Sequence, residues 1–169
     1  MNKLGIYIAS AIILAGVIGF GALKFFERDE FRGDSKFAEA SQEEAMASST
    51  KKMEGLEFAQ TIPEDASEAA VLAMMHKMTH QKIVASEKWG LIRMNEESIF
   101  KAKKILLASD FSKKKELLEM VNRWEKGQFD RVDDDHNYIW DLQGGSIGRA
   151  TGILTEQQEQ EFIENNFSD

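Results

Sequence analysis

The feature that most constrains this chain is an uncharged apolar segment near its N-terminus. Residues 4–23 (LGIYIASAIILAGVIGFGAL) contain no charged side chain, and an α-helix of that length spans the hydrocarbon core of a bilayer. A cleaved signal peptide has a shorter apolar region with a small-x-small site close behind it. Here Lys24 follows instead, and the nearest Ala-x-Ala is at residues 38–40. We therefore predict a transmembrane anchor over residues 1–26.

Small residues recur along one face of this segment. Ala11, Ala15 and Gly19 stand at successive fourth positions, and small residues at that spacing let two membrane helices approach closely. This face is therefore a candidate homodimer contact.

The charges beside the segment give two opposite predictions of topology. Lys24, Arg28, Arg32 and Lys36 follow the segment and Lys3 precedes it, which under the positive-inside rule keeps the following domain in the cytoplasm. However, a short basic tail before a long apolar segment is typical of an uncleaved export signal, and long domains translocate largely regardless of charge. We expect a single-pass protein of the cell membrane with an extracytoplasmic domain.

The stretch from residue 27 to residue 60 mixes charged residues with Ala and Ser and has few large apolar side chains. Such a composition cannot bury enough apolar surface to offset the entropy of ordering. We predict a flexible charged linker here, so that the folded domain begins at residue 61.

The chain beyond the apolar segment is strongly acidic. Only Lys3 and Lys24 of the 21 Lys and Arg residues precede residue 27, whereas all 29 Asp and Glu residues lie from residue 27 onward. This balance argues against nucleic acid as a partner, because affinity there depends on cations that neutralise phosphates. The absence of cysteine excludes a disulfide framework and a thiolate nucleophile. A protein or an envelope component remains as the expected partner.

The last part of the chain, residues 61–169, has helical periodicity and no sustained alternation of apolar and polar residues. Capping and stop signals divide it into five helices, which begin at a Thr61–Glu64 capping box, at Asn95, near Asp110, at Asp133 and at a Thr155–Gln158 capping box. We predict a small all-α domain of five helices.

A glycine-rich loop separates the last two predicted helices. Residues 142–155 contain four glycines, and Ile147 and Ile153 are the apolar residues expected to hold the loop against the core. Loops of this length in a compact helical domain are often functional or disordered. The three tryptophans, Trp89, Trp124 and Trp140, are predicted to be core residues.

The strongest signal for chemistry is a set of histidines. His76 and His80 are four residues apart on the first predicted helix, so both rings project from one face, as two zinc ligands on a helix require. His136 and the run from Asp133 to Asp135 offer further ligands. The glutamate that follows the first histidine of a metalloprotease helix is absent, since Lys77 stands there.

Two other chemistries find less support. The stretch "GGSIGRATG" lacks the Gly-Lys-Ser/Thr of a phosphate-binding loop and follows a helix rather than a strand. Ser146 lies among glycines but has no strand-turn-helix elbow around it. We expect no cofactor.

Two stretches of the domain resemble a known family. "MMHKMTHQKIVASEKWG" and "RWEKGQFDRVDDDHNYIWDLQGGSIGRATGILTEQQEQEFIENNF" are similar to small uncharacterised proteins of Gram-positive, spore-forming bacteria. These have an N-terminal anchor, a variable tether and a C-terminal domain of unknown function. The resemblance covers roughly residues 60 to 167 and implies no activity. The matching positions that it singles out are His76, His80, Trp89, Asp135, His136, Asn137, Trp140, Gln143, Gly144, Gly145 and Gly148.

These observations favour a membrane-anchored interaction or regulatory module of the bacterial cell envelope over an enzyme. Its binding surface would combine the first helix, the start of the fourth helix and the glycine-rich loop, with His76, His80, Trp89, Asp135, His136, Asn137, Gln143, Gly144, Gly145, Gly148 and Arg149. The alternative is a metal-dependent hydrolase that uses His76, His80 and His136 with one of the aspartates. Widely separated imidazoles would exclude that alternative, because zinc–nitrogen bonds are only about 2 Å long.

Overall fold

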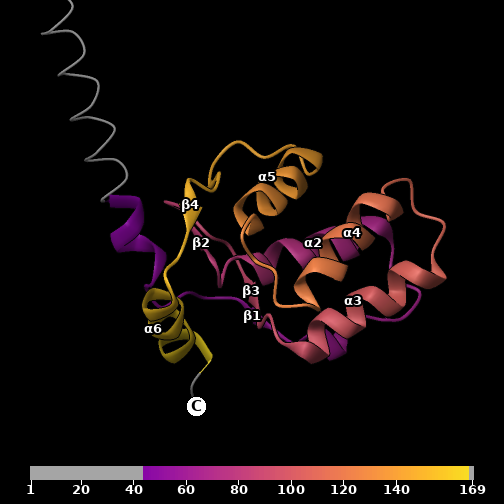
Figure 1. Ribbon diagram of the computed structural model, residues 1–169, viewed down its shortest axis with the longest axis horizontal. Helices are drawn as coiled ribbons and strands as arrows, with labels where there is room; N and C mark the ends of the chain where they lie inside the picture. Colours follow the sequence, from indigo (N-terminus) through magenta and orange to yellow (C-terminus); the bar gives the residue numbers. More distant parts are fainter. Residues whose placement is uncertain (1–43, 168–169) are drawn as a thin grey trace, which may run out of the picture. The chain divides into compact units, whose positions relative to one another are not determined.

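Polar side chains cap the start of three helices of the domain. The computed structural model describes residues 44–167 (Figure 1). Helix α2 (Glu68–Thr79) follows Ser67, whose hydroxyl accepts the N–H of Ala70. Helix α3 (Glu96–Ala108) starts with a capping box between Asn95 and Ser98. Helix α6 (Glu156–Phe167) starts with the predicted capping box of Thr155. These side chains satisfy N–H groups that a first helical turn leaves free.

The other two helices begin without a side-chain cap. Helix α4 (Lys114–Trp124) starts later than the predicted Asp110, and α5 (Val132–Leu142) starts one residue before Asp133. Asp133 is therefore not the N-cap, but it stands with the two following aspartates in the first turn, where negative charge stabilises the helix. Gly127 and Gly144 have φ angles of +70° and +71° after the two helices, as expected of glycine stop signals.

The five predicted helices are confirmed within residues 44–167, but α2 and α4 start later than predicted, and four strands were not expected. The Thr61–Glu64 capping-box prediction was wrong, since residues Ala59–Thr61 form the 3₁₀ helix η1 and α2 starts only after Ser67. Strands β1 (Leu56–Glu57) and β3 (Leu91–Ile92) pair in parallel, and β2 (Ile83–Val84) and β4 (Gly152–Ile153) pair antiparallel. Two-residue strands are too short to leave an alternating pattern. The domain is mostly helical.

Helix α2 is central to the packing. It packs against α3 and α5, and α3 packs against α4 (Figure 1). The buried side chains between these helices include Met74, Met75, Met78, Leu117 and Trp124. A second apolar cluster forms around Phe162 of α6. The pair β2–β4 ties the loop after α5 to the segment after α2, which brings the two parts of the candidate site together.

Residues 44–60 pack onto this domain. The Ser49 hydroxyl accepts the N–H of Ala85 at 3.0 Å, and the Thr50 hydroxyl donates to Glu161 at 3.0 Å. These residues belong to the same compact unit as the helices, so the domain starts before the expected residue 61. Polar contacts hold the segment together with the buried Ala45 and Ala59, and a count of large apolar residues detects neither.

The predicted anchor lies outside the described residues, as do the first part of the linker and the dimer residues Ala11, Ala15 and Gly19. Among residues 44–167, none of the helices has the length and apolar character needed to cross a membrane.

Several predicted core residues are exposed. Trp124 is buried, but Trp140 is only half-buried and Trp89 is 68% exposed, so the core prediction was wrong for these two. Ile147 and Ile153 are also exposed, and the buried apolar residues of the loop are Ala150 and Leu154 instead. An apolar residue in a loop has no helical period that would show which way it faces.

Candidate metal centre

The fold brings the three histidines of the chain together. His76 lies on α2 and His80 is the C-cap residue of that helix, and His136 comes from the first half of α5, which packs on α2. One nitrogen atom from each ring lies within 4.8 Å of the other two. The ring centroids of His136 are 4.5 Å from those of His76 and 5.6 Å from those of His80. The imidazoles are therefore close enough to share one ion.

Each imidazole uses its Nδ1 atom in a hydrogen bond with an oxygen acceptor. The Nδ1–H of His80 donates to the carbonyl of Gly90 at 2.7 Å, and that of His76 donates to Oε1 of Gln143. The Nδ1–H of His136 donates to Oδ1 of Asn137 at 3.2 Å. A proton on Nδ1 of a neutral ring leaves a lone pair on Nε2. In all three rings Nε2 is therefore available as a ligand, and the Nδ1 bonds resemble the second-sphere bonds of metal-binding histidines.

The histidines are held in the neutral form. Burial lowers the pKa of all three, and neighbouring charge from the other rings adds to the effect for His80 and His136. The pKa of His136 falls to about 4, and that of His80 falls well below its usual value. Burial disfavours the imidazolium because its charge loses solvation. Neutral imidazole is the form that binds metals.

His136 has a buried atom without a partner. The His136 side chain is fully buried, and its Nε2 forms no hydrogen bond with any residue in the described part of the chain. Buried polar atoms in proteins are nearly always paired, so an exception calls for an explanation such as a bound ion.

Asp135 does not belong to the site. Its carboxylate forms an ion pair with Arg123 and accepts the indole N–H of Trp124 at 2.9 Å. Burial raises the pKa of Asp135 despite these two partners. Asp133 and Asp134 are also absent from the group of side chains that converge as metal ligands, which within residues 44–167 consists of the histidines alone. The predicted His/Asp cluster is therefore a histidine cluster.

The glycine-rich loop is tied to α5 beside the histidines. The side-chain amide of Asn137 donates to the carbonyl of Ala150 at 3.0 Å, and its Oδ1 accepts the N–H of Ala150 at 2.8 Å. The indole N–H of Trp140 donates to the carbonyl of Ile147 at 2.9 Å. Arg149 pairs with Asp141 and stacks over the Trp140 ring, 5.5 Å from its centroid. These contacts give the loop a defined path, and they leave Arg149 with a structural role.

A cleft of about 290 Å³ opens beside the histidines. The residues that line it are His76, His80, Glu87, Trp89, Trp140, Gln143, Gly144, Gly145, Ser146, Ile147 and Gly148. Most predicted surface residues thus gather in one place. Glu87 was not among the predictions, since a lone glutamate in a connector has no pattern of its own. Its position two residues before Trp89 was the available hint.

We expect Gly145→Ala to distort the cleft. A Cβ atom at this position would overlap the indole ring of Trp140, and forced overpacking costs roughly 1 to 3 kcal/mol. Thermal unfolding of the full chain should show lower stability, with altered tryptophan fluorescence. Gly152→Ala is the control, because a Cβ there meets no atom within 4 Å. Equal stability of both variants would contradict the packing described here.

The fold and the site define a small, mostly helical domain with a three-histidine cluster. Residues 75–164 match the family of unknown function DUF6241, and the chain belongs to this family. The match confirms the C-terminal domain of unknown function and includes all three histidines. No curated protein and no solved structure matches the chain.

Proposed function

We propose that the domain binds one divalent first-row transition-metal ion through Nε2 of His76, His80 and His136, with zinc as the main candidate. Imidazole is a preferred ligand of zinc, copper, nickel and iron. The observation that carries the proposal is the buried, unpartnered Nε2 of His136 next to two more imidazoles whose Nδ1 atoms are already bonded.

The spacing of the rings fits an ion after a small adjustment. An ion placed centrally among three nitrogens that lie within 4.8 Å of one another is at most about 2.8 Å from each, against roughly 2.0 to 2.1 Å for a zinc–nitrogen bond. His76 is half-buried, and its partner Gln143 is an exposed side chain that can follow a rotation of the ring.

Packing alone explains the cluster less well. Buried histidines that serve only as core residues satisfy their ring nitrogens with protein partners. Here every Nδ1 has such a partner, whereas Nε2 of His136 has none among residues 44–167. Three neutral rings with their donor atoms turned to backbone or amide oxygens are organised as a ligand set.

We also propose that residues 4–23 anchor this domain in the cell membrane as a single-pass protein, with the domain on the extracytoplasmic side. The uncharged length of that segment supports the anchor, and Ala11, Ala15 and Gly19 support a homodimer. In this setting the metal centre would belong to an interaction or regulatory module of the cell envelope. The partner would bind the surface formed by α2, α5 and the glycine-rich loop.

Metal titration tests the proposed ion site directly. The full chain, purified in detergent without a histidine tag and stripped by a chelator, should bind one equivalent of Zn²⁺ in competition with a chromophoric chelator. Because the chain has three histidines in total, imidazole-based binding reports on this cluster alone. We expect His76→Ala and His136→Ala to weaken affinity at least about 100-fold, and Gln143→Ala to weaken it roughly 10- to 100-fold.

Gln157→Ala is the matched control for Gln143→Ala, because Gln157 is an exposed glutamine of α6. The His76→Ala variant is included because His76 is half-buried, so its removal should disturb folding less than removal of the fully buried His136. Circular dichroism checks the fold of each variant. A stripped chain that binds no Zn²⁺, or binding that His76→Ala leaves unchanged, would exclude the site.

A further inference from the structure

We propose that the metal ion keeps an open coordination position toward the cleft, and that Glu87 accepts a proton from water bound there, so that the site hydrolyses small carbonyl esters. This inference rests on the proposed metal site and adds an activity to it.

The number of ligands is the first argument. Structural zinc sites are closed by four protein ligands, whereas catalytic sites have three and keep a position for water or substrate. Within residues 44–167, the side chains that converge are three histidines without a carboxylate or a fourth imidazole. Asp135, the acidic residue next to His136, is engaged by Arg123 and Trp124. A tetrahedral ion on the three histidines would therefore have one position free.

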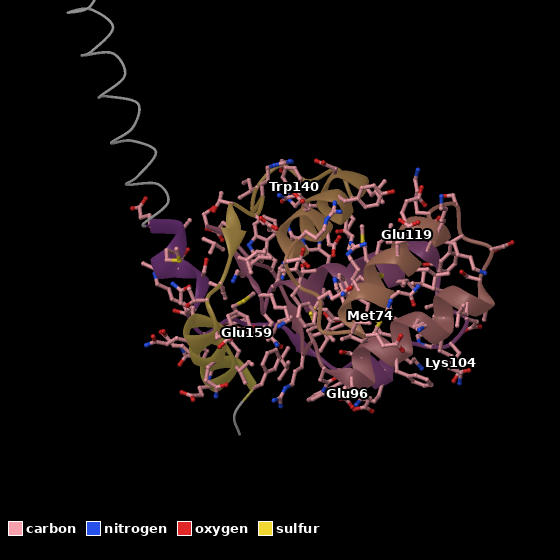
Figure 2. All side chains as sticks on the ribbon, viewed as in Figure 1. Met74, Glu96, Lys104, Glu119, Trp140 and Glu159 are labelled. Atoms are coloured by element: carbon pink, nitrogen blue, oxygen red, sulfur yellow. The ribbon has the colours of Figure 1, made fainter. Side chains whose placement is uncertain are left out.

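The burial of the rings shows which side is open. His136 is fully buried and His80 is 3% exposed, whereas His76 is half-buried. His76 and His80 line the cleft and His136 does not, so His136 closes the back of the site. The free position would face the cleft, which is lined by the exposed Trp89 and the half-buried Trp140. Figure 2 labels Trp140 at the α5 side of the domain.

Glu87 is placed to act on a molecule in that cleft. It is the carboxylate among the lining residues, its side chain is exposed, and it forms no ion pair with another described residue. Its carbonyl oxygen lies against Gly148, where a Cβ atom would be only 2.6 Å away. This close approach, allowed by glycine with φ +88°, holds Glu87 at the rim of the cleft. Because Glu87 is not within the group of converging ligands, it remains free to take a proton.

The reaction balances without a further reactant. A bound divalent ion lowers the pKa of its water toward neutrality. Glu87 takes the proton, and the hydroxide oxygen forms a bond to the carbonyl carbon of the ester. The bond from that carbon to the leaving oxygen then breaks, and the proton passes from Glu87 to the leaving oxygen. The products are a carboxylic acid and an alcohol, and no electron transfer is required.

Two measurements on the full, tag-free chain test the inference. In the first, Co²⁺ replaces Zn²⁺ and azide is added as a probe of the open position. We expect azide to change the visible absorption of the Co²⁺ protein, because it replaces bound water. In the second, the Zn²⁺-loaded chain is given 4-nitrophenyl acetate, with the stripped chain as the blank. We expect metal-dependent hydrolysis that Glu87→Gln lowers at least about tenfold in kcat/KM, in line with the loss of a general base.

The variants separate a role in proton transfer from a structural role. Glu87→Gln should leave Zn²⁺ affinity unchanged, and Glu87→Asp should recover part of the activity. Glu119→Gln, at an exposed glutamate of α4, is the matched control and should keep full activity.

The possible failures are distinguishable. If Co²⁺ binds but azide leaves its spectrum unchanged, or if hydrolysis does not depend on metal, the open position is wrong while the metal site stands. Full activity in Glu87→Gln would overturn the role of Glu87. A chain that binds neither Co²⁺ nor Zn²⁺ would overturn the proposed function itself.

Discussion

Replacing Trp124 with alanine is expected to lower the free energy of unfolding by about 3 to 5 kcal/mol, the range for large aromatic side chains removed from cores. Trp124 is 1% exposed and packs in the main core between the helices. Its indole N–H also donates to the buried carboxylate of Asp135 at 2.9 Å. The variant would therefore leave a cavity and remove one of the two partners of a buried acid, which is costly in itself.

Urea unfolding of the full chain, followed by far-UV circular dichroism, measures this loss. Trp89→Ala is the matched control, because Trp89 is 68% exposed, and surface substitutions usually change stability by less than about 0.5 kcal/mol. Trp124→Phe should lie between the two, since it keeps most of the volume and loses the hydrogen bond. Similar losses for Trp124→Ala and Trp89→Ala would show that the core is assigned wrongly.

The helices could be predicted from the sequence because their signals are local. Asn95 and Thr155 have their capping partners three residues away in the sequence. The stop signals at Gly127 and Gly144 likewise lie within a few residues of the helix ends that they mark. The pair His76 and His80 is local in the same sense, since a helix places them on one face. The convergence of His136 depends on how α5 packs against α2, which no short pattern specifies.

The acidic residues of the site show where sequence reasoning ends. Asp135 stands next to His136 in the chain, yet the helix turns its carboxylate toward Arg123 and Trp124 of α4. Glu87 lies in the connector that follows His80, outside any helix, and it lines the cleft where β2 and β4 bring this connector and the glycine-rich loop together. Neighbours in sequence on a helix face different directions, so adjacency is a poor guide to a ligand set.

Acid is expected to destabilise the metal-free protein well before its carboxylates are protonated. In the unfolded chain, the histidines have pKa values near 6.5. In the folded chain, burial lowers the pKa of His136 to about 4 and lowers those of His80 and His76 as well. The unfolded state therefore binds more protons below pH 6.5, so stability falls as the pH falls.

Other charged groups change the size of this loss but not its sign near pH 6. Nearby cations also lower the pKa values of the histidines, and they therefore increase the loss of stability in acid. These cations are Lys77, Lys88 and Arg149. Asp135 acts in the opposite direction, because its raised pKa makes the folded state bind its proton more tightly. The window from pH 6.5 to 5 lies above the usual range of carboxylate titration, and it isolates the histidines best.

His136 alone should contribute a loss of roughly 1.5 kcal/mol across that window, rising to about 3 kcal/mol when the pH reaches its folded pKa. Urea unfolding of the stripped chain at a series of pH values measures the slope, and His136→Gln, which has no titrating ring, should reduce it. Saturating Zn²⁺ should raise stability at pH 7 by about 2.7 kcal/mol when its free concentration is 100 times the Kd. Binding by an already neutral cluster has few protons to displace, so this gain should persist down to about pH 6. A stability that stays constant or rises between pH 6.5 and 5 would contradict neutral, buried histidines, and with them the preformed ligand set on which the metal centre depends.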